Sequence, residues 1–300
     1  MKTLNAFYDL EISPVSYDFV VFLVKAELAR RAADARRLHV VIVPFAEGIG
    51  GMFRDKSKLY DQHEAHWRLW NICIPACALL GASVTLATDW RQVDVIASDG
   101  ENWPLDWDRQ TLRNRPHLIG GVIDAAKAGE PIPVLCASEH ARRAARKLFK
   151  GRRVVTMTQR RTYLEGRNTI AQEWLGAAEY IEALGFHVFN IQDVATALER
   201  GAGFAELSID LRMAVYEEAE LNLIANNGCA SLCWFSRKPY RMFDAGVGDT
   251  EQEWRGLFCE QGLAWGASWP WATPQQRIVY ARSTRGVIFE EFSKWDGVTK

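Results

Sequence analysis

The chain lacks the features that would place it in several large functional classes. No stretch of its 300 residues approaches the ~20 consecutive apolar residues that a membrane-spanning helix needs. Its net charge is only −1, so it lacks the basic excess that is typical of nucleic-acid-binding proteins. The sequence therefore predicts no transmembrane segment and no nucleic-acid partner, and any anion-binding site must be local.

An export signal and a metal-binding cysteine motif are also missing. The start, MKTLNAFYDLEISPVS, carries acidic residues early and has no apolar central region. Four of the six cysteines form two pairs at i,i+4 spacing, which is the spacing of a helix face, and none of the six belongs to a C-x-x-C pair. We therefore expect reduced thiols, no metal site and a cytoplasmic location, with a disulfide or zinc site as the alternative. The cysteines are Cys73, Cys77, Cys136, Cys229, Cys233 and Cys259.

The sequence does contain apolar runs that alternate with helical patterns. This alternation is typical of parallel sheets with helices on both faces. The predicted fold is α/β, with two Rossmann-like, doubly wound parallel-sheet domains (1–150 and 151–300) that face a cleft. Strands are expected at 4–12, 38–45, 83–88, 132–137, 152–158, 186–193, 221–228 and 239–246. Helices are expected at 13–37, 57–81, 116–129, 138–149, 168–185, 208–219, 229–236 and 285–295, and residues 97–110 are expected to be irregular.

Single residues indicate where some of these helices begin, bend or end. Ser13 is the expected N-cap of the first helix, and Pro75 is expected to kink the helix at 57–81. Asn168 or Thr169 is expected to cap the helix at 168–185, which should stop at Gly185.

The predicted strand at 221–228 ends in Asn226, Asn227 and Gly228, directly before a short helix. Ligands of open α/β sheets lie outside the carboxyl ends of the strands. Glycine lets a backbone approach a ligand closely, and a helix N-terminus offers N–H groups to an anion. A diphosphate site and a well-capped turn explain the pattern equally well.

The segment 154–169, VVTMTQRRTYLEGRNT, places Arg160, Arg161 and Arg167 where another strand gives way to a helix. Guanidinium groups can clamp phosphate oxygens through paired hydrogen bonds, and Asn168 would lie at the same edge. Glu165 could orient an arginine or accept a hydrogen bond from a ribose hydroxyl. If this strand end lies beside Asn226–Gly228, the two form one diphosphate site; if not, a solvated loop is the better interpretation.

A glycine-rich turn in the first half, at 46–55, follows a predicted strand and contains Gly50 and Gly51. It lacks the G-x-G-x-x-G spacing and the Walker lysine, so a tight turn is the alternative to a phosphate-binding loop. Asp55, Asp61 and His63 follow it, and each is a candidate general base or merely a solvated residue.

Two further motifs permit more than one interpretation. Asp106 and Asp108 in PLDWD could bind a metal–nucleotide complex, but their irregular, tryptophan-rich surroundings favour a surface turn. Trp269 and Trp271 could stack on a sugar or a base, or they could pack at the junction of the two domains.

The second half resembles the nucleotide-binding domain of GT-B glycosyltransferases, most closely the heptosyltransferase-like group. The resemblance is carried by AELNLIANNGCASLCWFSRKPYRMF, in which a strand ends in an Asn–Gly turn and a short helix leads to Lys-Pro before the next strand. RRVVTMTQRRTYLEGRN and GIGG fall where that group carries its phosphate-proximal residues and its first-domain glycine loop.

This resemblance implies a bacterial glycosyltransferase that needs neither a metal nor another cofactor. The second domain would bind a nucleotide-sugar donor, with Arg161, Arg167, Asn227 and Gly228 at the diphosphate and Glu165 or Asp193 at ribose or sugar hydroxyls. The first domain would hold a glycan or small-molecule acceptor. A nucleotide-sugar epimerase of the same fold, or a non-catalytic binding or scaffold protein, are the alternatives.

Overall fold

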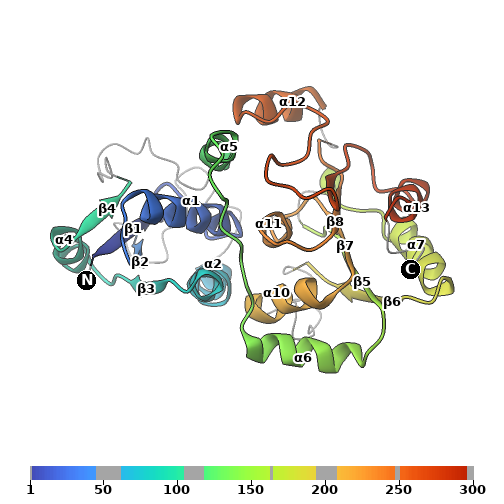
Figure 1. The fold of residues 1–300 in the computed structure, drawn as a ribbon, viewed down its shortest axis with the longest axis horizontal. Coiled ribbons are helices and arrows are strands. Elements are labelled where there is room, and N and C mark those ends of the chain that lie inside the picture. The colour runs from blue at the N-terminus through green and yellow to red at the C-terminus, as the bar shows by residue number, and fades with distance from the viewer. Residues whose placement is uncertain are drawn as a thin grey trace. The chain divides into compact units, whose positions relative to one another are not determined.

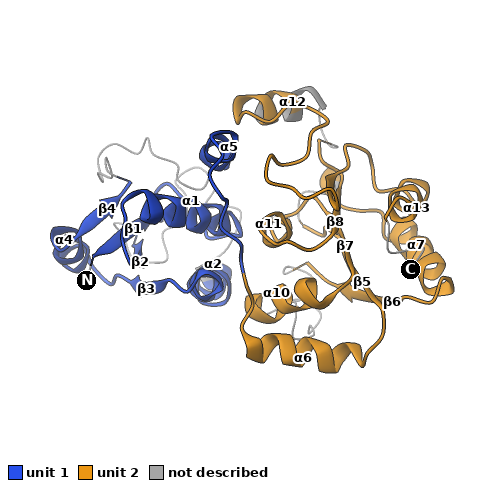
Figure 2. Ribbon diagram, in the orientation of Figure 1, with its two compact units in different colours: residues 1–135 blue, residues 136–300 orange. Residues whose placement is uncertain are grey.

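The computed structural model describes residues 2–44, 62–104, 118–162, 165–193, 208–246 and 251–295. The chain divides into two compact units, residues 1–135 and 136–300 (Figure 2). The division falls before helix α6 (Glu139–Phe149), whereas the sequence places it after this helix. Helix α6 lies with the second unit because it packs against α10 (Ile209–Glu218).

The first unit is built on a parallel sheet with the strand order β3-β2-β1-β4. Leu4–Asp9 of the central strand are buried throughout, as expected for a parallel strand that is covered on both faces. Its elements are β1 (Thr3–Asp9), α1 (Asp18–Ala32), β2 (Arg37–Val43), α2 (Gln62–Arg68), a π-helical turn (Leu69–Cys73), α3 (Ile74–Ala76), a 3₁₀ turn (Cys77–Leu80), β3 (Ser83–Leu86), α4 (Trp90–Ser98), β4 (Glu101–Trp103) and α5 (Gly120–Lys127).

The second unit is built on a parallel sheet with the strand order β6-β5-β7-β8-β9. Besides α6 and α10, its elements are β5 (Val154–Thr158), a 3₁₀ turn (Glu165–Arg167), α7 (Ala171–Ala183), β6 (His187–Ile191), β7 (Leu221–Ala225), α11 (Ala230–Trp234), β8 (Tyr240–Phe243), α12 (Glu251–Glu260), β9 (Gln276–Ile278) and α13 (Arg285–Ser293).

Helices cover both faces of the second sheet, with α7 and α13 on one side and α10 and α11 on the other (Figure 1). Trp174 of α7 lies at the centre of the first of these layers, fully buried and edge-on to Phe243 of β8. Its indole N–H donates to the Ser283 hydroxyl at 2.9 Å, so the polar atom of this buried ring is satisfied.

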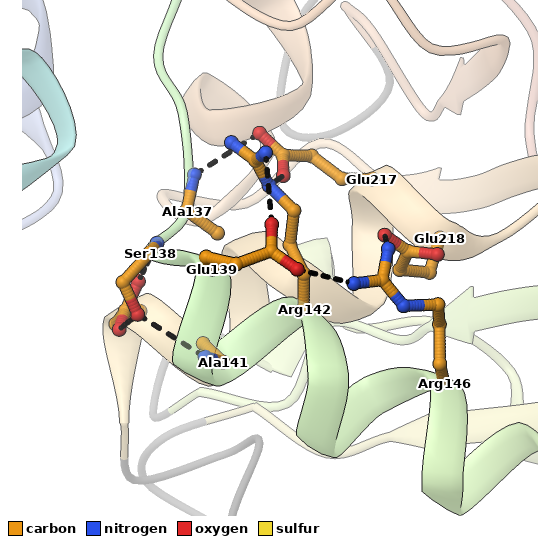
Figure 3. Close-up of polar contacts among 9 residues, drawn as sticks. Ala137, Ser138, Glu139, Ala141, Arg142, Arg146, Glu217 and Glu218 are labelled. Carbon is orange, nitrogen blue, oxygen red and sulfur yellow. Dashed lines mark hydrogen bonds and ion pairs between the residues drawn. The ribbon is translucent and has the colours of Figure 1, made fainter.

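Polar contacts bind α6 to α10 along one side of the second unit (Figure 3). Arg142 pairs with Glu217 at 2.7 Å, and Arg146 pairs with Glu218 at 3.0 Å. The Ser138 hydroxyl accepts the Ala141 N–H, which caps α6 at its N-terminus. Exposed ion pairs contribute little stability, so these contacts serve mainly to orient α6 on its neighbour.

The predicted α/β fold with two doubly wound parallel sheets is confirmed, while some predicted elements are wrong. Residues 132–137 form no strand, because this apolar stretch is the extended connection that leads from one unit into the next. Helix α4 and strand β4 lie in or beside the segment that the sequence left irregular. At Pro75 the helix is interrupted as expected, since the Ile74 N–H bonds to the Leu69 carbonyl in a π-helical turn.

Ser13 does not cap α1. The helix begins at Asp18, its N-cap position is Tyr17, and no side chain caps it. The reason lies in the turn after β1, where the Ile12 and Ser13 N–H groups both donate to the Asp9 carbonyl and Ser13 becomes buried.

The cysteines divide into buried and exposed thiols. Cys73, Cys77, Cys229 and Cys233 are buried, whereas Cys136 and Cys259 are exposed. Burial raises the pKa of Cys77 to about 12 and also raises that of the other three buried thiols, so none of the four forms a thiolate near neutral pH.

We therefore expect two of the six thiols to react rapidly with an aromatic disulfide reagent at pH 8, and all six after denaturation. A stopped-flow absorbance trace with peptide mapping would test this. Rapid labelling of Cys229 or Cys233 in the native chain would contradict the described packing of α11.

The described residues hold no helix with the length and apolar character of a membrane span. They also contain no group of three or more histidine, cysteine or acidic side chains arranged to hold a metal ion.

Candidate functional site

The carboxyl ends of β5 and β7 lie side by side. These strands pair in parallel with Thr158 opposite Ile224, and the strand order of the sheet reverses between them, because β6 is added on one side of β5 and β7 on the other. Such a reversal point is where ligands bind in doubly wound sheets. The expectation that these two strand ends lie side by side is confirmed.

Direct contacts join the two strand ends. The Arg160 guanidinium donates through Nη1 to the Asn226 carbonyl at 2.5 Å. In the opposite direction, the Asn227 amide donates through Nδ2 to the Gln159 carbonyl at 3.4 Å. Arg160 and the Asn226–Gly228 turn are therefore in direct contact at the same edge of the sheet.

The loop after β5 closes on itself through Asn168. The Asn168 amide accepts from the Thr162 N–H and donates to the Thr162 carbonyl, both at 2.8 Å. The Thr169 N–H and hydroxyl both donate to the Arg160 carbonyl at 3.2 Å. The expectation that Asn168 or Thr169 caps α7 is therefore wrong: both polar groups are used within the loop, and the N-cap position is Ile170.

The loop brings the end of β6 to the same edge. The backbone N–H of Arg161, whose side chain is exposed, donates to the Asp193 carboxylate at 3.2 Å. Arg167 is half-buried in the 3₁₀ turn, and the side chain of Glu165 lies outside the described residues. Asp193 and Arg161 thus lie together, as a site at this edge requires.

Arg282, which the sequence reasoning did not single out, holds this loop from the other side. It follows β9 and donates to the Asn168 carbonyl at 3.0 Å and to the Gly166 carbonyl at 3.4 Å. Arg282 follows a strand, as Arg160 does. The rule that ligands lie at the carboxyl ends of strands could therefore have identified Arg282 from the sequence.

The turn after β7 satisfies most of its own backbone groups. The N–H groups of Ala230, Ser231 and Leu232 donate to the carbonyls of residues 227, 228 and 229. The expectation that the α11 N-terminus offers several free N–H groups is therefore wrong for these three positions. Gly228 is exposed at the tip of the turn, and its N–H donates to no acceptor among the described residues.

A buried polar network lies beneath the β5–β7 edge. The Thr158 hydroxyl bonds to the Tyr216 hydroxyl at 3.0 Å. Arg212, fully buried, donates to the Cys229 sulfur at 3.3 Å and to the Gln192 carbonyl at 3.0 Å. Burial raises the pKa of Cys229, and the nearby Arg212 charge partly opposes that rise. This network could not be predicted from the sequence, because Arg212 and Tyr216 lie within an ordinary helical pattern.

Asp244 ties the end of β8 to the connection between β9 and α13. Its carboxylate accepts from the Ser283 N–H and hydroxyl, both at 2.7 Å. Its φ of +59° is in the left-handed region, which residues other than glycine seldom adopt. Burial raises the pKa of Asp244, while the bonds from Ser283 and the charges of Arg282 and Arg160 lower it.

The tryptophan pair near the C-terminus packs within the second unit. Trp269 and Trp271 stack at 5.4 Å between centroids, and Trp271 stacks on Phe235 at 5.5 Å. Trp269 is only 3% exposed, so it offers no face to a ligand. The packing alternative is favoured over the sugar platform, and the partner of Trp271 is Phe235, the residue after α11.

Most of the first-unit candidates lie outside the described residues: Gly50, Gly51, Asp55, Asp61, Asp106 and Asp108. His63 is exposed near the start of α2. The described part of this unit adds Asp18, an exposed carboxylate in the first turn of α1 that accepts from the Ser16 hydroxyl at 3.0 Å. It follows β1, where the strand order of the first sheet reverses toward β4.

Comparisons with known proteins identify the fold. No family profile and no curated protein matches the chain. A solved glycosyl transferase family 9 structure from Veillonella parvula superposes with a TM-score of 0.57 at 9% identity, covering 97% of this chain and 96% of that one. The E. coli ADP-heptose LPS heptosyltransferase II superposes with a TM-score of 0.50 at 11% identity, covering 98% of each chain. At such low identity the similarity shows the fold alone: this chain has the two-unit, GT-B-like fold of heptosyltransferase-like glycosyltransferases.

Proposed function

We propose that this protein is a glycosyltransferase that moves a sugar from a nucleoside-diphosphate donor to a glycan or small-molecule acceptor. The observation that carries the proposal is the paired carboxyl edge of β5 and β7, where Arg160 contacts the Asn226–Gly228 turn at a reversal of strand order. The whole-chain similarity to two glycosyltransferase structures adds support at the level of fold.

The second unit would hold the donor. Arg160, Arg161 and Arg167 would face the diphosphate, together with the exposed Gly228 N–H and the amide of Asn227. Asp193, which already receives the Arg161 N–H, would accept from a ribose or sugar hydroxyl, and Glu165 is the second candidate for that role. Asn168 would act indirectly, because its amide closes the loop that carries the arginines.

The chemical demand on such a site is to stabilise the negative charge that develops on the departing diphosphate. Cationic side chains and oriented N–H donors supply this stabilisation without a metal ion. We therefore propose metal-independent transfer.

The first unit would hold the acceptor and the general base that deprotonates it. Asp55, Asp61 and His63 are the candidates from the sequence. Asp18 joins them because an exposed carboxylate at the carboxyl edge of a parallel sheet can accept a proton from a bound hydroxyl.

Titration calorimetry with ADP, UDP and GDP, each compared with its nucleoside, tests the donor site. We expect at least one diphosphate to bind about 100-fold more tightly than its nucleoside, because charge-assisted hydrogen bonds to phosphate are worth roughly 1.5–3 kcal/mol each. ADP is the first choice, since one similar structure is that of an ADP-heptose enzyme. The affinity should survive EDTA. If no diphosphate binds, or if nucleosides bind equally well, the proposed function is wrong.

A further inference from the structure

We propose that Cys229 is a positioning residue whose thiol fixes the side-chain amide of Asn227 so that its NH₂ group faces the donor diphosphate. The proposal rests on the function proposed above, and it concerns how that site is preorganised. It starts from a line of contacts in which Arg212 reaches the Cys229 sulfur and Cys229 reaches Asn227.

The contacts have a definite direction. Arg212 can only donate, so its Nη1 donates to the Cys229 sulfur at 3.3 Å. The Cys229 S–H in turn donates to Asn227 Oδ1 at 3.0 Å. Burial raises the pKa of Cys229, which keeps the thiol protonated and able to donate. The group between a donor-only arginine and an amide oxygen must both accept and donate, and a thiol does both.

This arrangement fixes which way the Asn227 amide points. Its Oδ1 accepts from two donors, the Cys229 thiol and the Ala230 N–H at 3.2 Å. If the Asn227 amide were flipped, its NH₂ group would face both donors, and neither donor would have an acceptor there. The NH₂ group therefore lies on the β5 side, where one hydrogen reaches the Gln159 carbonyl at 3.4 Å. No described residue accepts the second hydrogen, so it can donate to a ligand oxygen at the edge proposed to bind diphosphate.

Cys233, which lies in α11, is a matched control for Cys229, the N-cap residue of that helix. It lies one turn after Cys229 and is fully buried, but no hydrogen bond joins its sulfur to a described residue of the network. Replacing either cysteine by alanine removes one buried sulfur, so the two cavities cost similar stability. Only Cys229→Ala removes the donor to Asn227.

The binding test compares Cys229→Ala, Cys229→Ser and Cys233→Ala with the wild-type chain, by calorimetry with the tightest diphosphate and its nucleoside. We expect Cys229→Ala to weaken the diphosphate about tenfold and to leave the nucleoside unchanged, because one aimed hydrogen bond is lost. Cys229→Ser should recover most of the affinity, and Cys233→Ala should retain it. Equal losses in both alanine variants, or no loss in Cys229→Ala, would overturn the proposal.

A second measurement needs no ligand. The Asn227 side-chain NH₂ resonances, assigned through an Asn227→Asp variant, should shift in Cys229→Ala and stay in place in Cys233→Ala. Unmoved resonances in Cys229→Ala would overturn the positioning role even if the diphosphate binds. If the wild-type chain binds no diphosphate, the proposed function fails first and the positioning role fails with it.

Discussion

Replacing Arg160 by methionine is expected to weaken nucleoside-diphosphate binding about 50-fold, with little change for the nucleoside. The guanidinium lies at the reversal of strand order and donates to the Asn226 carbonyl. Burial raises the pKa of Asp244, and the Arg160 charge is close enough to oppose part of that rise. Losing a charge-assisted contact to phosphate costs roughly 1.5–3 kcal/mol, which corresponds to this change in affinity. Calorimetry on the variant measures it directly.

Arg153, the residue directly before β5, provides the control. It precedes β5 at the opposite end, pairs with Glu220 at 2.9 Å and lies over the Phe186 ring. Arg153→Met should therefore keep the diphosphate affinity, although it removes the same charge from the chain. Equal weakening in the two variants would mean that net charge, and not the β5–β7 edge, governs binding.

Replacing the general base is expected to lower donor turnover by about 10²–10⁴-fold, the usual contribution of a positioned base. Among the candidates we expect the loss in Asp18→Asn, because Asp18 is an exposed carboxylate at the reversal point of the first sheet. Asp55, which lies outside the described residues, is the alternative that the sequence supplies. Release of nucleoside diphosphate from the donor sugar reports turnover without knowledge of the acceptor.

Asp61→Asn is the control for this comparison, and diphosphate affinity is measured beside turnover in every variant. A base variant should lose kcat while its affinity for the donor diphosphate stays unchanged. Loss in Asp55→Asn with full activity in Asp18→Asn would assign the base to Asp55. Equal activity in Asp55→Asn and Asp61→Asn would exclude Asp55 as the general base. Full activity in all three variants would exclude Asp18, Asp55 and Asp61 from that role.

The sheets and the paired site edge could be predicted from the sequence because they depend on strong local signals. Parallel strands that are buried on both faces are near-continuous apolar runs, and β2, β5 and β7 all show this pattern. Once β5 and β7 are neighbours, their polar ends must meet at one edge. That is why the contact between Arg160 and Asn226 could be anticipated from two motifs some 60 residues apart.

Other features depend on contacts between distant segments and could not be predicted. Asn168 precedes a helix and is a residue type that often caps helices. In the structure its side-chain amide instead bonds within the loop after β5, and Arg282, which follows β9, donates to the same loop. The run at 132–137 is as apolar as a strand, yet it joins the two units and pairs with no strand among the described residues. The contact between Arg212 and Cys229 depends on how the helix of Arg212 packs beneath the turn after β7, which the sequence of that helix does not indicate.

A structure of the chain with a bound nucleoside diphosphate would test the central claim most directly. We expect the diphosphate oxygens to lie at the carboxyl ends of β5 and β7, within hydrogen-bond reach of Arg160, the Asn227 NH₂ group and the Gly228 N–H. A diphosphate bound elsewhere in the chain, with this edge left unchanged, would contradict the proposed donor site.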